Sequence, residues 1–158
     1  MPIDPAGIPT DTDLAMMERA IELAADAAMQ GEVPIAAIIY RGDEVVAEGW
    51  NRRETDHDAS AHAEIVAIRE AGRKLGQWRL NGLSMAVTLE PCPMCAGALV
   101  NSRMERLIYG ADDQKAGACR TLYEIPEDRR LNHRLDVIGG VMADECVALL
   151  RAFFSARR

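Results

Sequence analysis

Apolar residues recur along the chain at two spacings, which alternate from segment to segment. The spacing typical of helices predicts helical segments over 13–30, 61–75, 91–101 and 142–156. Short apolar runs between turn residues predict strands over 33–40, 44–50, 83–89, 105–109 and 134–138. Asp13 is expected to cap the first helix, Gly31 to end it, and Pro91 to open the third.

The order of these elements predicts the fold class. Two strands joined as a hairpin, followed by alternating helices and strands, are typical of a sheet with helices on both faces. We therefore expect a three-layer α/β/α sandwich with a mixed five-stranded sheet. A length of 158 residues fits one domain with its own core, which we place at 13–158 after a mobile leader over 1–12.

The composition excludes several classes of protein. With 27% charged residues and no apolar run near 20 residues, the chain fits neither a disordered protein nor a membrane span. Its first residues lack both the basic start and the apolar stretch of a secretory signal, so we expect a cytoplasmic protein. In that compartment the four cysteines are expected to be metal ligands, catalytic groups or core residues rather than disulfides.

The formal charge of -7 is unevenly distributed. Residues 1–32 hold seven acids against Arg19 alone, so the rest of the chain is nearly neutral. Basic residues gather late in the chain, at Arg129, Arg130, His133, Arg134, Arg151, Arg157 and Arg158. Local basic patches therefore remain for a polyanionic partner in spite of the acidic total.

Two motifs carry the candidate chemistry: His62-Ala63-Glu64 and Pro91-Cys92-Pro93-Met94-Cys95. Each stands at the start of a predicted helix. Cys92 and Cys95, three residues apart, project on one side of their helix, and His62 can supply a third ligand. Three protein ligands leave one position open, which is typical of a catalytic zinc site. We expect one zinc ion per chain.

Glu64 is expected to move protons rather than to bind the metal. Zinc can lower the pKa of a bound water from about 15.7 to roughly 7 and so supply hydroxide at neutral pH. Two residues beyond His62 on a helix, Glu64 points away from the ligand direction and flanks this water. A carboxylate in that place can act as general acid and base.

Other interpretations of the same residues stay open at this point. A Cys-x-x-Cys motif at a helix start after a strand also describes a thioredoxin-like redox site. A structural zinc site would need a fourth ligand, for which the candidates are Cys119, His57 and His133. Cys146 lies in an apolar run and is expected in the core, whereas Cys119 has no assigned role.

The two motifs together resemble the zinc-dependent nucleobase deaminases. The chain is further similar to the bacterial tRNA-specific adenosine deaminases from about Met17 to Arg158. The matching positions are 31–34, 49–51, 61–64, 88–92, 94–98, 109–111, 113, 115, 117–118, 132–134, 143–146 and 153–154. The resemblance implies a cytidine deaminase-like fold and zinc-dependent hydrolysis of adenosine to inosine at the wobble position of a tRNA anticodon stem-loop.

Specific roles also follow from the resemblance. It implies that Asn51 hydrogen-bonds the purine, that Asp113 lies near the ribose, and that Asn132 and His133 begin a strand that faces RNA. The residues assigned to the substrate are Asn51, Ala63, Asp113, Asn132, His133, Arg157 and Arg158. The chain departs from the family pattern at Arg53, at Asp112 and over the loop 124–131.

Two rival functions remain. A free nucleobase deaminase acting on guanine or cytosine would use the same metal site, although the matches at Asp113 and at Asn132-His133 disfavour it. A catalytically idle RNA-binding subunit would not need an intact Glu64.

The third predicted helix suggests an assembly. Its apolar residues Met94, Ala98 and Leu99, with the nearby Met104, leave surface that needs a cover. The final helix could pack over that surface within one chain, and periodicity alone favours neither solution. The resemblance implies a homodimer in which each anticodon loop is bound across both subunits, so we expect a homodimer.

Overall fold

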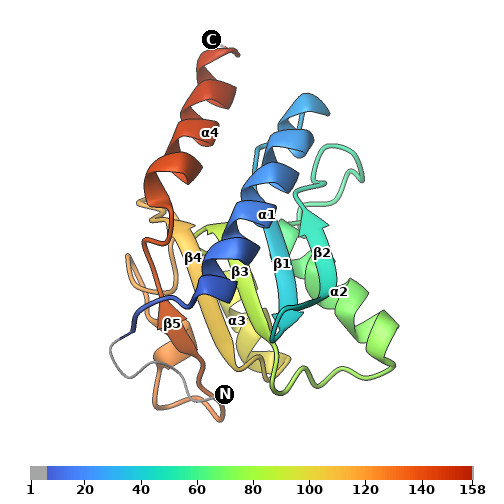
Figure 1. The fold of residues 1–158 in the computed structure, drawn as a ribbon, viewed down its shortest axis with the longest axis vertical. Coiled ribbons are helices and arrows are strands. Elements are labelled where there is room, and N and C mark those ends of the chain that lie inside the picture. Colours follow the sequence, from blue (N-terminus) through green and yellow to red (C-terminus); the bar gives the residue numbers. More distant parts are fainter. Residues whose placement is uncertain (1–6, 158) are drawn as a thin grey trace.

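A mixed sheet forms the middle layer of the molecule (Figure 1). The computed structural model describes residues 7–157. Within them the strands are β1 (Ala36–Arg41), β2 (Glu44–Trp50), β3 (Ser84–Leu89), β4 (Arg106–Ala111) and β5 (Asp136–Ile138). They form one sheet in the order β2-β1-β3-β4-β5. Strand β1 is antiparallel to β2 and β3, whereas β4 is parallel to β3 and β5.

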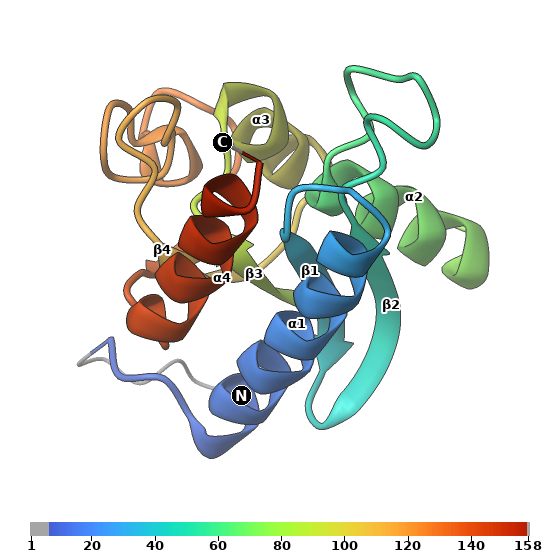
Figure 2. The same cartoon turned by 90° about the horizontal axis from the view of Figure 1, so that it is seen from above.

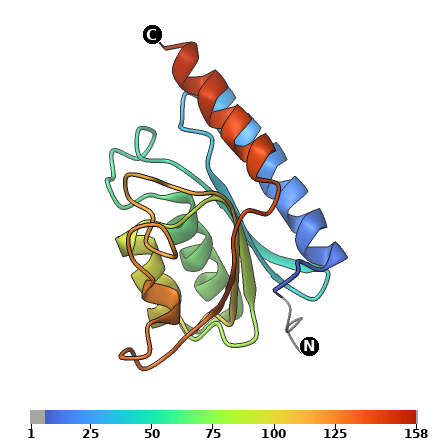
Figure 3. The same ribbon diagram turned by 90° about the vertical axis from the view of Figure 1, so that its left-hand side faces the viewer.

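Helices cover both faces of this sheet. In the described part of the chain they are α1 (Asp11–Met29), α2 (Ala63–Leu75), α3 (Pro93–Asn101), α4 (Ala143–Ser155) and the short 3-10 helix η1 (Ile125–Glu127). Helices α1 and α4 lie on one face and α2 and α3 on the other (Figures 2 and 3). The predicted three-layer α/β/α sandwich with a mixed five-stranded sheet is thus confirmed. Among the helices of residues 7–157, none combines the length and the apolar character that crossing a bilayer requires.

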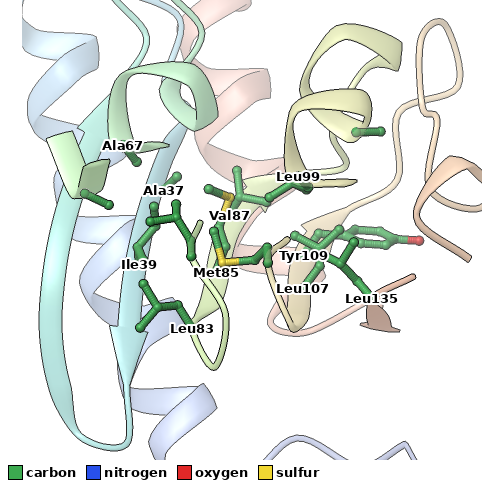
Figure 4. Close-up of a cluster of buried hydrophobic side chains, with 14 of the residues drawn as sticks. Ala37, Ile39, Ala67, Leu83, Met85, Val87, Leu99, Leu107, Tyr109 and Leu135 are labelled. Atoms are coloured by element: carbon green, nitrogen blue, oxygen red, sulfur yellow. The ribbon is translucent and has the colours of Figure 1, made fainter. Parts of the chain in front are cut away.

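Each face of the sheet has its own apolar layer, because successive side chains of a strand point to opposite faces. Ile39 and Val87 belong to the layer under α2 and α3 (Figure 4). Ile38 and Ala86, their neighbours in sequence, belong to the layer under α1 and α4. The second layer includes Cys146, which is 1% exposed, so its predicted place in the core is confirmed.

The start of the first helix differs from the prediction. The N-cap is Thr10, not Asp13, and the helix begins at Asp11. Thr10 and Asp13 form a capping box, in which the Thr10 amide donates to the Asp13 carboxylate at 2.8 Å and the Asp13 amide to the Thr10 hydroxyl at 3.1 Å. The predicted leader 1–12 therefore overlaps the helix at its end, and residues 1–6 lie outside the described part.

Three other boundaries differ. The third helix begins at Pro93 with Cys92 as its N-cap, so Pro91 precedes the helix instead of opening it. The sheet begins at Ala36 because the Ile35 amide donates to the Val33 carbonyl at 2.8 Å, which makes a tight turn before the strand. The last strand begins only at Asp136, and η1 was not predicted.

The apolar residues of α3 are mostly covered within the chain. Leu99 and Met104, expected to need a cover, are fully buried against the sheet. The alternative cover is also wrong, because α4 packs on the opposite face of the sheet (Figure 3). Met94 alone of the large residues in this group is exposed, at 40%.

Candidate active site

Strand direction brings distant residues to one edge of the sheet. Because β1 is antiparallel to both β2 and β3, the carboxyl ends of β2, β3 and β4 lie at the same edge. The residues that follow these ends are Asn51, Glu90 and Asp113. Ligand sites of open α/β sheets form at this edge.

The first residues of α2 and α3 meet there as well. His62 is the N-cap of α2 and Cys92 is the N-cap of α3, and neither side chain caps its own helix. The His62 Nδ1 atom lies 3.6 Å from the Sγ atoms of both Cys92 and Cys95. The three donor atoms all lie within 4.8 Å of one another, close enough for one ion with bonds of about 2 Å to reach all of them. The sequence therefore predicted a donor set that the fold brings together.

The alternatives of a redox site and of a structural metal gain no support. All four cysteines are free thiols. None of the fourth-ligand candidates joins the group of three donors. His57 is exposed, the Cys119 thiol lies 3.9 Å from the Pro91 carbonyl, and the His133 Nε2 atom donates to the Met104 carbonyl at 2.6 Å. An open fourth position is what a catalytic metal site requires.

The donor atoms form a polarised cluster. Hydrogen bonds from the Cys95 thiol and from the His62 ring lower the pKa of Cys92 to about 4. The hydrogen bond to Cys92, together with burial, raises the pKa of Cys95. The same cluster raises the pKa of His62, chiefly through its hydrogen bond with Cys92. Both helix amino termini add positive potential at the sulfur atoms, which favours thiolate.

Glu64 lies beside this cluster without joining it. The side chain belongs to the first turn of α2 and is 4% exposed. Burial raises the pKa of Glu64 to about 7. A carboxyl group with such a pKa can give and take a proton near neutral pH, which general acid-base catalysis requires.

These groups stand at one side of a cavity of about 380 Å³. Of the residues predicted to contact substrate, Asn51, Ala63 and Asp113 line it. The other lining residues are Val33, Ile35, Arg53, His62, Glu64, Leu89, Glu90, Cys92, Lys115, Ala116 and Phe154. The cavity therefore combines apolar walls with charged groups at one site, as small-molecule and nucleotide pockets do.

Several lining residues were not predicted. Phe154 reaches the cavity from α4 and is 49% exposed, whereas the adjacent Phe153 is 8% exposed. The helical period could have distinguished these two residues. Consecutive side chains of a helix point about 100° apart, so Phe153 and Phe154 cannot both face the core. Glu90 was noted only as part of the matching segment 88–92. A charged residue directly after a buried strand indicates specific partners, because isolated charges are seldom buried.

The remaining predicted substrate residues do not line the cavity. Asn132 is exposed in the loop before β5, and His133 contacts the Met104 carbonyl. The expected strand does not start at these two residues, because the chain joins the sheet only at Asp136. The Arg157 guanidinium lies 3.4 Å from the centroid of the Phe153 ring, and Arg158 lies outside the described residues. Their contact with RNA stays a prediction.

The fold and the donor set define the class of protein. A three-layer sandwich that holds a His/Cys/Cys group and a neighbouring buried glutamate is typical of the nucleobase deaminases with a cytidine deaminase-like fold. The family model of the MafB19-like deaminases matches residues 11–158. The chain belongs to this family of deaminases.

Several relatives of high identity share one name, tRNA-specific adenosine deaminase. A tRNA-specific adenosine deaminase of Bacillus subtilis is 46% identical over 146 residues, which cover 92% of this chain and 91% of the relative. A tRNA-specific adenosine deaminase of Haemophilus influenzae is 41% identical over 157 residues, covering 99% and 91%. A structure from a study of A-to-I editing by tRNA:A34 deaminases at the wobble position of transfer RNA superposes with a TM-score of 0.82. It is 40% identical and covers 86% of this chain and 99% of its own. The resemblance drawn from the motifs is confirmed.

Proposed function

We propose that this chain hydrolyses adenosine to inosine at the wobble position of a tRNA anticodon loop. The observation that carries the proposal is the group of His62, Cys92 and Cys95 beside the buried Glu64, in a cavity that opens to the surface. Relatives with 41–46% identity over nine-tenths of the chain are tRNA-specific adenosine deaminases. An anticodon loop suits such a cavity because its bases are unpaired and can leave the stack at low cost.

Zinc is the metal that this donor set fits. Two thiol sulfurs and one imidazole nitrogen are typical zinc ligands, and three of them leave one position for the reaction. We propose that His62, Cys92 and Cys95 hold one zinc ion per chain. When bound, the ion lowers the pKa of the attacking water toward neutrality.

Glu64 is the proposed general acid and base. Its carboxylate accepts a proton from the attacking water and passes it to N1 of the adenine ring. The water oxygen forms a bond to C6; Glu64 then moves the second water proton to the amino nitrogen, the C6–N bond breaks and ammonia leaves. Adenosine and water thus give inosine and ammonia, and no other reactant is needed.

Asn51 is the proposed contact to the purine. The side chain is 4% exposed, lines the cavity, and uses its Oδ1 atom to accept the Arg53 amide at 3.3 Å. Its amide group is therefore oriented with NH₂ free to donate to an acceptor on the base. Ala63 and Asp113 line the same cavity and are the proposed contacts to the base and to the ribose.

A homodimer is the proposed assembly. Four large apolar residues on α3 and on the loops after β4 remain exposed, namely Met94, Leu122, Tyr123 and Leu131. The loop 112–121 packs beside the start of α3, where the Ala118 amide donates to the Pro91 carbonyl at 2.9 Å. Exposed apolar residues of this kind suit contact with a second copy of the chain. In the dimer, Asn132, His133, Arg157 and Arg158 would bind the RNA held in the partner's cavity.

A cytoplasmic location is proposed with the substrate, since tRNA is decoded there.

Competition among substrates tests the proposed function. Release of ammonia would be measured with an anticodon stem-loop that carries a wobble adenosine and, in separate reactions, with free adenosine, guanine and cytosine; inosine would be identified in the stem-loop product. The proposal predicts turnover of the stem-loop at a rate far above that of the free compounds. Preferential release of ammonia from guanine or cytosine would instead support a free nucleobase deaminase with the same metal site.

A further inference from the structure

Two buried glutamates lie outside the metal group: Glu90 lines the cavity, and Glu32 directly precedes the lining residue Val33. Glu32 and Glu90 are each 1% exposed, and neither forms a salt bridge with any residue in 7–157. The Arg52 charge acts on Glu32 without a salt bridge, and a buried charge without a direct ionic partner is costly unless hydrogen bonds replace the lost water. Their partners therefore show what the two charges do.

The partners of Glu90 all belong to one loop, 112–121. One carboxylate oxygen, Oε2, accepts the backbone amides of Cys119, Arg120 and Thr121 at 3.1, 2.9 and 2.9 Å. The other oxygen, Oε1, accepts the Asp113 amide at 3.1 Å and the Thr121 hydroxyl. Burial would raise the pKa of Glu90, but these hydrogen bonds lower it, so the group is an anion in the folded protein.

Glu32 binds a second loop, 51–60, in the same manner. Its carboxylate accepts the Glu54 amide at 3.3 Å, the Thr55 amide at 2.7 Å and the Thr55 hydroxyl at 2.5 Å. The hydrogen bonds from Thr55 lower the pKa of Glu32 against the effect of burial. Each loop thus wraps one acceptor through backbone amides and one threonine hydroxyl.

The two loops supply polar wall residues of the cavity. Loop 112–121 contributes Asp113, Lys115 and Ala116, and the residues Asn51 and Arg53 belong to loop 51–60. Both glutamates lie in short connections between elements that pack on or in the sheet. Glu32 follows α1, and Glu90 lies between β3 and the metal-binding start of α3.

We propose that Glu32 and Glu90 are positioning residues that hold the two substrate-binding loops in register with the metal site. They act on substrate through the loops, so they set binding of the nucleic acid rather than the chemical step. The identity of that substrate rests on the function proposed above. Asp58 and Asp113 also accept hydrogen bonds within these loops, but both are loop residues themselves and so do not fix the loops to the rest of the fold.

Every group that contacts the Glu32 and Glu90 carboxylates is a hydrogen-bond donor, so each position requires a side chain that only accepts. An ionised carboxylate only accepts hydrogen bonds, whereas the amide of glutamine turns one of its two arms into a donor. In Glu90→Gln that arm would face backbone N–H groups, and the same holds for Glu32→Gln. The space beside Glu90 is also closed, because a Cβ on Gly117 would strike the Glu90 carboxylate and lie 2.6 Å from the Asp113 carbonyl oxygen. The loop therefore cannot shift closer to compensate.

The test compares Glu90→Gln, Glu32→Gln and the double variant with Glu124→Gln, an exposed glutamate near the same region whose side chain makes no hydrogen bond in the structure. Zinc content, thermal unfolding, and kcat and KM on the anticodon stem-loop are measured for each. We expect KM to rise about tenfold in each single variant, the effect of a buried donor that loses its acceptor, with zinc content unchanged and kcat within about threefold. Glu90→Asp, which keeps an acceptor-only group, should bring KM closer to that of the wild type than the isosteric glutamine does.

A second readout does not depend on activity. Loop 112–121 holds two trypsin sites, Lys115 and Arg120, and loop 51–60 holds Arg52 and Arg53. Glu90→Gln should speed cleavage in the first loop alone and Glu32→Gln in the second alone, whatever substrate the enzyme uses. A fall in unfolding temperature with unchanged KM and with cleavage spread over the chain would overturn the proposal, because it would mean general destabilisation. Failure of the wild type on the stem-loop with loop-specific cleavage intact would contradict the proposed substrate only.

Discussion

Gly49 lies where α2 packs on strand β2. Its replacement by alanine should displace α2 and, with it, the residues that α2 contributes to the metal site. A Cβ at this position would press on the Ala63 carbonyl oxygen and lie 2.6 Å from the Ala67 amide nitrogen, whereas ordinary contact begins at 3.4 Å. Both atoms belong to the backbone of α2, so no side-chain rotation relieves the overlap. Helix α2 must move away from the sheet by about 1 Å, the difference between these two distances.

That displacement sets the size of the loss in stability and of the loss in activity. Overpacking of this kind costs about 1–3 kcal/mol of folding free energy. At roughly 2.1 cal/mol/K of unfolding entropy per residue, the 158 residues give a fall in Tm of about 3–9 °C. His62 and Glu64 flank Ala63, so the reacting groups move with the helix. A misplacement of about 1 Å can reduce activity by roughly a hundredfold.

The assay pairs Gly49→Ala in β2 with Gly97→Ala in α3, the second helix that carries residues of the site. A Cβ on Gly97 meets no atom within 4 Å, and alanine is favoured over glycine in a helix by about 1 kcal/mol. Thermal unfolding, sedimentation and kcat/KM are measured for both variants. Gly97→Ala should keep its activity, and its Tm should rise by about 3 °C or stay unchanged, but not fall. Activity of Gly49→Ala within about twofold of the wild type would refute the argument that this contact positions α2.

Three further predictions concern other groups. Glu64→Gln should reduce kcat by about 10²- to 10⁴-fold with one zinc ion per chain retained, and loss of the metal would show that Glu64 is a ligand instead. Asp13→Asn should cost about 3–5 kcal/mol in urea unfolding at pH 7, because it breaks the buried pair with Arg106. Burial raises the pKa of Asp13, but hydrogen bonds from Arg106 and Tyr40 outweigh it and lower the pKa below 3.8. This stabilisation is therefore present above pH 3.8 and lost as the pH falls further, so the two proteins should converge in acid and a constant gap would contradict the pairing. Arg157→Gln should flatten the log-log salt dependence of stem-loop binding by roughly one unit, and an unchanged slope would remove Arg157 from the interface.

The metal group could be predicted from sequence because its determinants are local. Cys92 and Cys95 share one helical turn, and His62 stands at a helix start that the apolar pattern defines. These positions within a helix do not depend on how the rest of the chain packs. The helices and the five strands were predictable for the same reason, since each carries its own apolar period.

Boundaries and cavity walls depend on contacts between distant residues and could not be predicted in this way. Thr10 and Asp13 are both favourable N-cap residues. Asp13 is buried because it pairs with Arg106, which lies 93 positions away, and Thr10 is therefore the N-cap. Glu90 finds its partners 23 to 31 positions later, in a loop without periodic pattern. The position of Leu99 was wrongly interpreted because periodicity shows which face is apolar, but not what covers it.

The position of inosine within a whole tRNA tests the central claim most directly. An unmodified tRNA with adenosine at the wobble position would be incubated with the zinc-loaded protein and sequenced after reverse transcription, which reads inosine as guanosine. The Glu64→Gln variant serves as the inactive control. The account predicts conversion at the wobble adenosine and at no other adenosine of the molecule. Conversion spread over several adenosines, or none with full zinc occupancy, would contradict it.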